Sequence, residues 1–487
     1  MSHAGKRVVI AGVGQSISRW RAEAGAATAP SPGSLRLEAA RAALGGRTDV
    51  DVIAVVRTTE DSVPTSTYPN GRDANPPGTL ARDLGLRAGE LVYSAVGGQT
   101  PQELVNELAS RIHAGEIASA LVVGAEAVAA AKAARRAGLA LDWSDDDPAA
   151  FEDRGAALDW LCPEELRHGL ITPGHYYGLA ESTQITDGLA AYRDAMGDLL
   201  APFSETAARS AYAQFPVART ANWLATESSE NYAVAYPYLK WHVAQDAVNQ
   251  GAAIVLMRED LAGASALAWL RAGASATDAV LTEREDMAHA GAAEASGLSV
   301  LEQAGITAAH VDAWDLYSCF PIAVWSALDA LDLDTELPLT QTGGLQFFGG
   351  PGNNYSLHAI AAMAERLSGT DDTGCVLANG GWMSKVATGL YSGAPCDFIP
   401  PPPVARLGKQ RRRVSGDCHG RLEAFTFTPA RSGVIGGTAT VLTEAGHRAI
   451  AQVSGTALAR LVAEPTPIGA DVEVTVGNGI GRLSFRG

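Results

Sequence analysis

Cysteine is scarce in this chain of 487 residues, which has five, at positions 162, 319, 375, 396 and 418. They are too few and too widely scattered for a disulfide framework or a cysteine-based zinc site. None of the ten histidines has the spacing of a metal-binding helix or pairs with cysteines, so the sequence predicts no metal site. Unpaired thiols are typical of a reducing compartment, and we expect a cytoplasmic protein.

The chain also has fewer basic than acidic residues, and it has few long apolar runs. Lys and Arg total 37 against 54 Asp and Glu, a net charge of −17, and such a surface repels phosphate backbones, which argues against nucleic-acid binding. Glu126 and Lys132 interrupt the most apolar stretch, and no leader-like signal opens the chain, so we expect no membrane span. Gly12 and Gly14 lack the third glycine and the acid of a dinucleotide fingerprint.

Hydrophobic residues, at 47%, are sufficient for several packed cores, and about 150 residues per domain predicts about three domains. Residues 1–126 alternate apolar β-branched runs with helical patterns. The predicted strands begin at Arg7 and cover 52–56 and 120–124, and the predicted helices cover 35–44 and 101–112. This alternation predicts an α/β domain with buried strands.

Residues 242–395 repeat the pattern of residues 1–126. After a first strand near 245–257, the segment shows a helix over 292–304, a strand over 311–316, a helix running from Gly343 and Gly344 through Arg366, and a strand over 375–378. Three of these elements match earlier ones, in the same order, at offsets of about 250 to 260 residues. The sequence therefore predicts a duplicated α/β half.

The rest of the chain differs from these halves in composition. Residues 127–241 are rich in tryptophan, tyrosine and acidic clusters, and we interpret them as an insertion, the loop domain, that covers one face of the sheet and carries binding function. Residues 396–413 form a linker stiffened by four consecutive prolines. In residues 414–487, β-like runs over 423–428, 437–442 and 472–476 predict a small all-β domain, barrel-like or OB-like.

The chain resembles the thiolase superfamily over about residues 6–395. The resemblance rests on the duplicated halves, the insertion and two Gly-Gly loops that each precede a helix. The sequence QDAVNQGAAIVL at 245–256, the glycines 343, 344, 349 and 350, and the segment 379–391 resemble its sterol carrier protein-x branch. The β-rich tail looks like the additional domain of thiolase-like proteins type 1. The resemblance implies a five-layer αβαβα fold and an acetyl-CoA acetyltransferase-like protein of lipid metabolism.

The residues at the catalytic positions of the family differ in this chain. The resemblance places the nucleophilic cysteine at Gly98, in a segment (95–101) that has no thiol, and the activating histidine at Gly350. Tyr317 stands where the family has an oxyanion-hole Asn or His, and Asn379 replaces the second cysteine. Members of a catalytic unit act together. The resemblance therefore implies a protein that binds CoA or acyl-CoA, needs no cofactor, and lacks cysteine-dependent Claisen or thiolysis chemistry.

Two residues of the third motif are catalytic candidates. Thiolase-fold aldolases that cleave steroid side-chain CoA esters resemble this chain in having a tyrosine in that motif and a β-barrel partner, so Tyr317 is a candidate acid or base. Its alternative role is to fill the pocket. In this chain Gly350 stands where those aldolases have a second tyrosine. Cys319 is either a displaced nucleophile or a small buried hydrophobe.

Glycine loops and polar residues make up the candidate CoA pocket. Its predicted members are Gly97, Gly98, His175, Ser318, Gly349, Gly350 and Asn379. The glycines either bring backbone N–H groups close to a carbonyl oxygen or form tight turns. His175 either contacts the acyl chain or is structural. The basic cluster Arg406, Lys409, Arg411, Arg412 and Arg413 meets CoA phosphates, meets a partner's acidic face, or is a solvated flank of the linker.

Three functions are consistent with these residues. The first is an acetyl-CoA acetyltransferase-like protein that binds a CoA ester, and the second is a retro-aldolase that uses Tyr317. The third is a non-catalytic scaffold that holds a protein partner, for example through the C-terminal domain. The sequence leaves open whether any reaction is catalysed, and whether the protein is a monomer or a homodimer.

Overall fold

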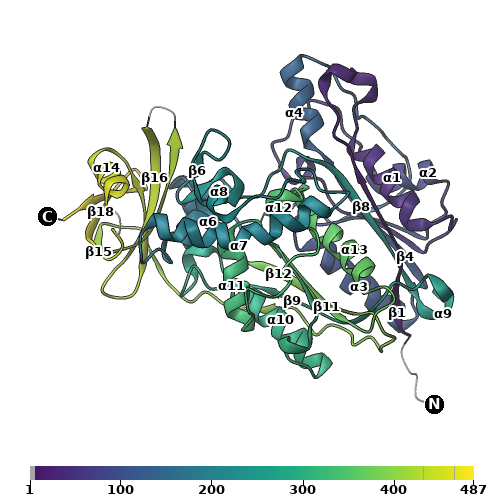
Figure 1. Cartoon of the computed structure of the whole chain (residues 1–487). Helices are drawn as coiled ribbons and strands as arrows, with labels where there is room; N and C mark the ends of the chain where they lie inside the picture. The colour runs from purple at the N-terminus through teal and green to yellow at the C-terminus, as the bar shows by residue number, and fades with distance from the viewer. Residues whose placement is uncertain (1–5, 159, 431–432, 465–466, 487) are drawn as a thin grey trace.

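A computed structural model describes residues 6–158, 160–430, 433–464 and 467–486. In these ranges the chain forms an 11-stranded mixed sheet covered by helices, and a separate six-stranded sheet near the C-terminus (Figure 1). Within the same ranges, no helix combines the length and the hydropathy that crossing a membrane requires.

The N-terminal half supplies five principal strands of the large sheet. One of them is the strand that the sequence analysis places near 245–257, at the start of the second half; it pairs with two strands of the first half and belongs there. Its elements are β1 (Val8–Ile17), α1 (Pro32–Leu44), β2 (Val52–Val55), α2 (Pro76–Leu84), β3 (Glu90–Tyr93), α3 (Thr100–Ala114), β4 (Ser119–Ala127) and, after the insertion, β8 (Asn249–Arg258). Helix α1 begins at Pro32, three residues before the predicted start at 35, because Pro32 fits the first turn and the Ser31 hydroxyl caps it by accepting from the Ser34 amide at 3.0 Å. All nine residues of β4 are buried, since helices cover both faces of the sheet.

The C-terminal half repeats this arrangement. It consists of β9 (Ala268–Thr277), α10 (Gly291–Ala304), β10 (Ala313–Leu316), α11 (Pro321–Leu331), α12 (Gly344–Phe347), α13 (Tyr355–Leu367), β11 (Thr373–Gly380) and β12 (Lys385–Ser392). The order β2–β4–β8–β1, with one parallel and two antiparallel pairings, matches β10–β11–β12–β9. The predicted duplication is therefore confirmed. Pairing of β1 with β9 at Val9 and Ile10 joins the halves.

The layers follow from the contacts of the helices. Helices α3 and α13 contact each other and strands of both halves, so they form the central layer. Helices α1 and α2 pack outside the first half, and α10 and α11 pack outside the second. The fold is the predicted five-layer αβαβα arrangement.

The segment after Gly343 departs from the sequence prediction, which has one helix from the two glycines through Arg366. Helix α12 ends at Phe347, and α13 begins only at Tyr355. Between them Gly349 has φ of 119° and Gly352 has φ of 52°, conformations that end a helix, and Pro351 has no N–H to donate. The prediction of a single helix is wrong.

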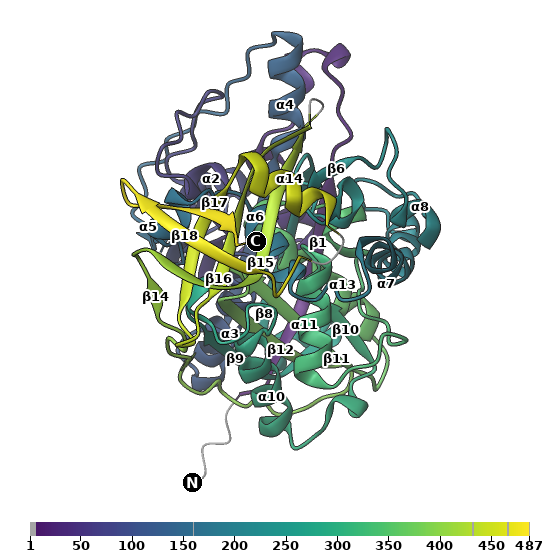
Figure 2. The same cartoon turned by 90° about the vertical axis from the view of Figure 1, so that its left-hand side faces the viewer.

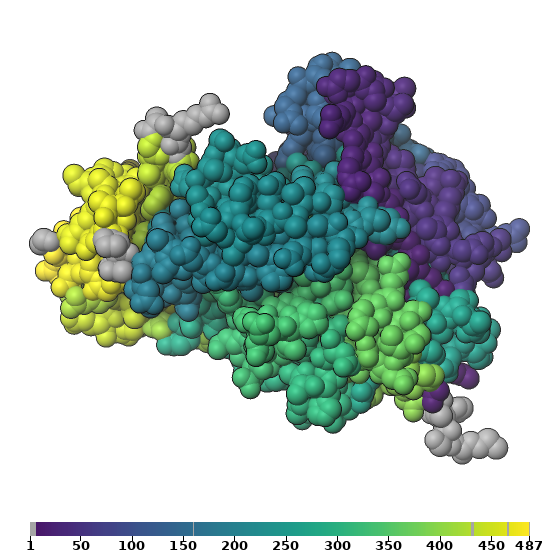
Figure 3. All heavy atoms as spheres, in the orientation of Figure 1, coloured from purple at the N-terminus to yellow at the C-terminus, as the bar shows by residue number. Residues whose placement is uncertain are grey.

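The insertion forms its own layer across the large sheet. Its elements are α4 (Val128–Ala137), β5 (Glu152–Asp153), α5 (Pro163–Arg167), α6 (Pro173–Ser182), α7 (Leu189–Arg209), α8 (Ala221–Ala225), β6 (Ala233–Ala235) and β7 (Tyr238–Leu239). Figure 3 shows the region of α6, α7 and α8 as a teal surface between the purple N-terminal half and the yellow C-terminal domain, whereas α4 lies apart beside the purple residues.

A buried carboxyl fastens the insertion to the C-terminal half. Glu181 of α6 accepts hydrogen bonds from the hydroxyls of Tyr192 and Tyr238, both at 2.7 Å. It also accepts from the amide of Ile322 at 3.0 Å, in the first turn of α11, where the helix dipole favours a carboxylate. Burial nevertheless raises the pKa of Glu181 to about 7.

The C-terminal domain is a small barrel (Figure 2). The linker first adds β13 (Ala405–Arg406) to the large sheet beside β9. The domain then contains β14 (Arg413–Val414), β15 (Cys418–Ala430), β16 (Gly433–Leu442), β17 (Arg448–Val453), α14 (Gly455–Ala463), β18 (Asp471–Gly477) and β19 (Ile480–Phe485). Pairing of β17 with β19 closes a ring of five strands. The predicted all-β barrel is confirmed, with one helix that the sequence analysis did not predict.

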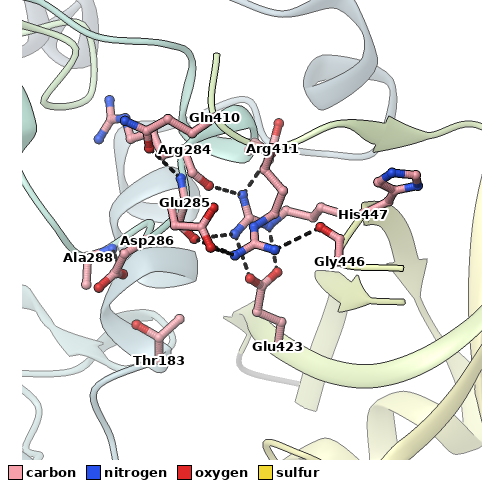
Figure 4. A network of polar contacts seen from close by, with 12 residues as sticks. Thr183, Arg284, Glu285, Asp286, Ala288, Gln410, Arg411, Glu423, Gly446 and His447 are labelled. Carbon is pink, nitrogen blue, oxygen red and sulfur yellow. Dashed lines mark hydrogen bonds and ion pairs between the residues drawn. The ribbon is translucent and has the colours of Figure 1, made fainter. Parts of the chain in front are cut away.

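Arg448 holds the barrel against the core. Its guanidinium, fully buried, forms two 2.6 Å hydrogen bonds with the carboxylate of Glu423. It also donates to the carbonyls of Thr282 at 2.9 Å and Arg284 at 2.6 Å, on the loop after β9. Around this pair Arg411 bridges Glu285 and Gly446 (Figure 4). The ion pair between Arg448 and Glu423 thus lies within the barrel and orients the guanidinium, whose remaining N–H groups fix the barrel to core carbonyls.

We predict that Glu181→Gln changes the pH dependence of stability. The folded pKa of about 7 lies above the ordinary value of 4.5, so protonation of Glu181 stabilises the fold below pH 4.5, and this contribution is lost as pH rises to about 7. Glutamine is neutral throughout. The free energy of unfolding of the variant relative to wild type should therefore rise across this window, by up to about 1.4 kcal/mol per pH unit.

Denaturant unfolding of both proteins at several pH values measures this difference. The exposed Glu444→Gln variant is the control and should follow wild type. Parallel curves for Glu181→Gln and wild type would contradict the prediction.

Candidate functional site

Four residues predicted from the sequence meet at one edge of the sheet. Tyr317 and Cys319 directly follow β10, Asn379 lies near the end of β11, and Gly98 precedes α3. Strands β10 and β11 are parallel, so their carboxyl ends lie at the same edge. The amino end of α3 reaches the same edge, because Gly98 contacts both Tyr317 and Asn379.

Gly98 is packed so closely that no side chain fits there. A Cβ added to Gly98 would lie 2.6 Å from the hydroxyl oxygen of Tyr317, and closer still to the carbonyl oxygen of Asn379. From the other side, the Ser356 hydroxyl donates to the Gly98 carbonyl at 2.6 Å. The position is glycine because backbone and side chain of the C-terminal half approach it directly.

Tyr177 of the insertion completes this cluster. The Asn379 side-chain amide donates to the Tyr177 hydroxyl at 3.2 Å and to the sulfur of Cys319 at 3.9 Å. The Tyr177 ring stacks on Phe320 at 4.3 Å between centroids. Among the described residues, Asn379 Oδ1 has no hydrogen-bond partner although it is buried. We refer to Gly98, Tyr177, Tyr317, Cys319 and Asn379 as the central cluster.

Burial keeps the thiol and the phenols of the central cluster protonated. It raises the pKa of Cys319 to about 12, and it raises the pKa values of Tyr317 and Tyr177 far above their ordinary range, with the neighbouring Cys319 adding to the effect. A thiol with such a pKa is a weak nucleophile at neutral pH, because the thiolate is the reactive form. The cluster offers neutral hydrogen-bond donors rather than an activated nucleophile.

The other predicted pocket residues lie around the cluster or outside it. Gly97 precedes Gly98 in the same loop, with φ of 142°. Ser318 is buried and accepts from the Leu345 amide at 3.2 Å. His175 lies on α6, where its ring nitrogen Nε2 meets the Thr428 hydroxyl of the barrel at 2.8 Å, and burial lowers its pKa. The structure therefore places His175 at the contact with the barrel.

The second glycine loop contains Gly349 and Gly350. The Gly350 amide donates to the Gln245 carbonyl at 2.9 Å, and a Cβ at Gly350 would have only ordinary contacts, the nearest 3.5 Å from Ala244. A Cβ at Gly349 would lie 2.7 Å from Gln250 and from Val248. Gly350 therefore leaves space beside Ala244, whereas its N–H already has a backbone partner.

The basic cluster of the linker pairs largely with acids of the same chain. Lys409 and Arg413 each lie 2.9 Å from Glu283, and Arg411 pairs with Glu285. Lys409, Arg413 and Arg406 also line a cavity of 510 Å³ beside Lys385. Arg411 and Arg413 thus fasten the linker to the core, whereas Lys409 pairs with Glu283 from a side chain that is 74% exposed, as expected for a solvated flank.

Cavities approach the central cluster without reaching it. Five cavities of 300 to 510 Å³ in the described residues are lined by none of Gly98, Tyr317, Cys319 and Asn379. One of them, of 300 Å³, is lined by Phe215, Trp241, Phe347 and Arg219. It is separated from the cluster by Gln346, whose amide donates to the carbonyl of Ser318.

We predict that Gly98→Ala destabilises the protein by about 1–3 kcal/mol, the usual cost of overpacking a filled site. The matched control is Gly477→Ala, because a Cβ at Gly477 meets nothing within 4 Å and its backbone is not left-handed. The control should stay within about 0.5 kcal/mol of wild type. Equal stability of the two variants in denaturant unfolding would contradict the close packing at Gly98.

No protein-family model and no curated protein matches the chain. Among solved structures, the acetyl-CoA acetyltransferase from Syntrophomonas wolfei is 17% identical, with 80% of this chain and 100% of that chain covered and a TM-score of 0.56. The Ltp2-ChsH2(DUF35) aldolase is 18% identical over 80% of this chain and 98% of that chain, also with a TM-score of 0.56. At these identities, both show a common fold.

The similarity to a third structure covers the barrel as well. A monomeric SCP2-thiolase like protein type 1 from Mycobacterium smegmatis is 30% identical, with 98% of this chain and 99% of that chain covered and a TM-score of 0.80. Its coverage includes nearly the whole chain, in agreement with the duplicated core, the insertion and the C-terminal barrel described above. The chain belongs to the SCP2-thiolase-like family of the thiolase superfamily.

Proposed function

We propose that the protein binds CoA or an acyl-CoA and does not catalyse cysteine-dependent Claisen condensation or thiolysis. The packing of Gly98 against Tyr317 and Asn379 is the observation that carries this proposal. A thiolase nucleophile needs a thiol at the amino end of a helix, where the dipole lowers its pKa. Here that position has neither a thiol nor space for one, and the thiol of Cys319 has a raised pKa.

The apolar cavity lined by Phe215, Trp241 and Phe347 suits the nucleotide end of CoA. Trp241 and Phe347 lie nearly parallel with centroids 5.9 Å apart. The Lys240 ammonium lies 5.0 Å from the Trp241 ring, and the Arg219 guanidinium lies 6.0 Å from it. Aromatic faces beside cations favour a purine ring with its phosphates.

A path of backbone contacts connects this cavity with the central cluster. Trp241 is followed by Ala244, whose amide donates to the Cys319 carbonyl at 2.9 Å. Gly350 lies beside Ala244, where a Cβ would already have ordinary contacts at 3.5 Å, so a pantetheine arm on this path requires the glycine loop to move. At the end of this path no protein group in the described residues accepts from the Tyr317 hydroxyl, so it remains available to a thioester carbonyl. An acyl-CoA ligand with no resident cofactor would follow this path.

The wider role follows the same proposal. In this proposal the protein acts in lipid metabolism in the cytoplasm, and any acyltransferase activity would have to proceed without a cysteine acyl-enzyme. A non-catalytic scaffold that holds a partner through its barrel is the alternative if no CoA ester binds.

We predict that calorimetry detects binding of CoA and of long-chain acyl-CoA to wild type. Trp241→Ala and Arg219→Ala should each weaken binding at least about tenfold, because they remove the stacking surface and the phosphate partner. Arg421→Ala, which changes an exposed arginine of the barrel, is the control and should bind like wild type. Absence of heat and of a thermal shift would contradict CoA binding and favour the scaffold.

A retro-aldolase is the second candidate. It is favoured by the Tyr317 hydroxyl, which lies against Gly98 without a protein acceptor, and by the barrel within the same chain; the aldolase structure of similar fold carries DUF35 in its name. Because burial raises the pKa of Tyr317, its phenol stays protonated at neutral pH and would donate a hydrogen bond to the enolate oxygen that cleavage generates, while a separate base takes the proton of the β-hydroxyl.

We predict that, if a β-hydroxyacyl-CoA is cleaved, Tyr317→Phe abolishes the cleavage. The variant leaves CoA binding and the packing of the ring intact, so a calorimetric titration separates loss of chemistry from loss of binding. Tyr355→Phe, which changes the neighbouring phenol at 5.3 Å, is the matched control. Unchanged turnover in Tyr317→Phe would dismiss the aldolase candidate.

A further inference from the structure

A second cavity lies in the N-terminal half, on the far side of the second glycine loop. It has a volume of 330 Å³, and its walls include Pro32, Val63, Val128 and Trp143 together with the carboxyl groups of Glu60 and Glu126. Its lining contains no Lys, Arg or His. A small, largely apolar cavity with two carboxyl groups is selective for positive charge.

Glu126 lies near the end of β4, and only one of its two carboxylate oxygens accepts hydrogen bonds from the described residues. Its Oε1 accepts from the amide of Thr59 at 2.6 Å and from the Thr59 hydroxyl at 2.8 Å. Gly352 packs directly behind this oxygen, where a Cβ would collide with it. Among the described residues no group donates to Oε2, although the side chain is 96% buried (4% exposed) and lines the cavity. A buried carboxyl oriented in this way lacks a partner on the cavity side.

The charges that act on Glu126 come from two other elements. Glu60, in the turn after β2, opposes its ionisation, and Arg36 of α1 favours it. Burial is the largest effect and raises the pKa of Glu126 to about 7. Oε2 is open to the cavity and is not a sealed, unpaired atom, so a cation bound in the cavity would pair with it directly.

Trp143 supplies an aromatic wall at a fixed position. It packs on an apolar cluster that includes Leu35, Ala127 and Ala130, and it is shared with the neighbouring cavity of 340 Å³ beside Arg36. Tryptophan is the strongest cation–π partner among the aromatic side chains.

The walls favour an organic cation over a metal ion. Calcium and magnesium take at least six oxygen ligands, or keep their water, whereas this cavity is mostly apolar. No group of three or more His, Cys, Asp and Glu in the described part of the chain could hold a metal ion.

We propose that this cavity binds a small organic ammonium ion, whose nitrogen lies between Glu126 and Glu60 and against the ring of Trp143. The site is separate from the CoA path and does not depend on it. Binding stabilises the ionised form of Glu126, so it releases a proton at pH values below 7 and strengthens as pH rises. Because about a tenth of a group with a pKa of about 7 is ionised one unit lower, affinity should fall about tenfold between pH 8 and pH 6.

The test is a calorimetric titration with choline and with its neutral isostere 3,3-dimethylbutan-1-ol, at pH 6 and pH 8. Buffers that differ in ionisation enthalpy report the proton released at pH 6. Choline should bind with the expected pH dependence, and the isostere should not bind. Glu126→Gln keeps an acceptor for Thr59 but loses the charge, so it should weaken choline binding at least about tenfold and abolish proton release. The exposed Glu444→Gln is the matched control.

Three results would overturn the proposal: no choline binding at pH 8, equal binding of choline and the isostere, or unchanged binding in Glu126→Gln. If Glu126→Gln does not fold, Trp143→Leu takes its place, because it removes the cation–π partner and keeps an apolar wall. It should also weaken choline binding at least about tenfold, and an unchanged affinity in this variant would equally refute the site.

Discussion

The central constraint in this structure is the contact of Gly98 with the Tyr317 hydroxyl and the Asn379 carbonyl. Two parallel strands bring their carboxyl ends against the amino end of α3, and the glycine lets these backbones meet without a side chain between them. A cysteine at this position would need the strands or the tyrosine to move. The loss of the nucleophile is therefore built into the packing as well as the sequence.

Helix α6 connects this centre with the barrel. Tyr177 points from α6 into the central cluster, whereas His175 on the same helix contacts Thr428 of β15. The barrel is in turn fixed to the core by Arg448, which pairs with Glu423 inside the barrel and donates to the core carbonyls of Thr282 and Arg284. Removal of one partner of such a buried pair is strongly destabilising. The barrel thus holds the wall of the central cluster in place, which gives it a structural role independent of any partner.

The duplicated core could be predicted from the sequence because its strands are buried on both faces and appear as continuous apolar runs. The resemblance to the thiolase superfamily implied that Gly98, Tyr317, Cys319 and Asn379 belong to one site. Tyr177 was missed because adjacent residues on a helix point about 100° apart, and the sequence does not tell which face of α6 is inward.

Other features depend on contacts that are distant in sequence. The break between α12 and α13 depends on the backbone conformations of Gly349 and Gly352. The pairing of Lys409, Arg411 and Arg413 with acids at 283–285 depends on how the linker crosses the core. Local composition indicates a turn near the glycines and a basic segment in the linker. Tertiary contacts determine that the turn separates two helices and that the basic segment pairs with acids of the core.

Mass spectrometry of the protein after incubation with acetyl-CoA tests the central claim most directly. The thiol of Cys319 is protonated at neutral pH and the position of the nucleophile is a glycine, so peptides that contain Cys319 should carry no acetyl group, and neither should the segment around Gly98. An acetyl group that accumulates on Cys319, and is removed by added CoA, would show a working acyl-enzyme and contradict this account.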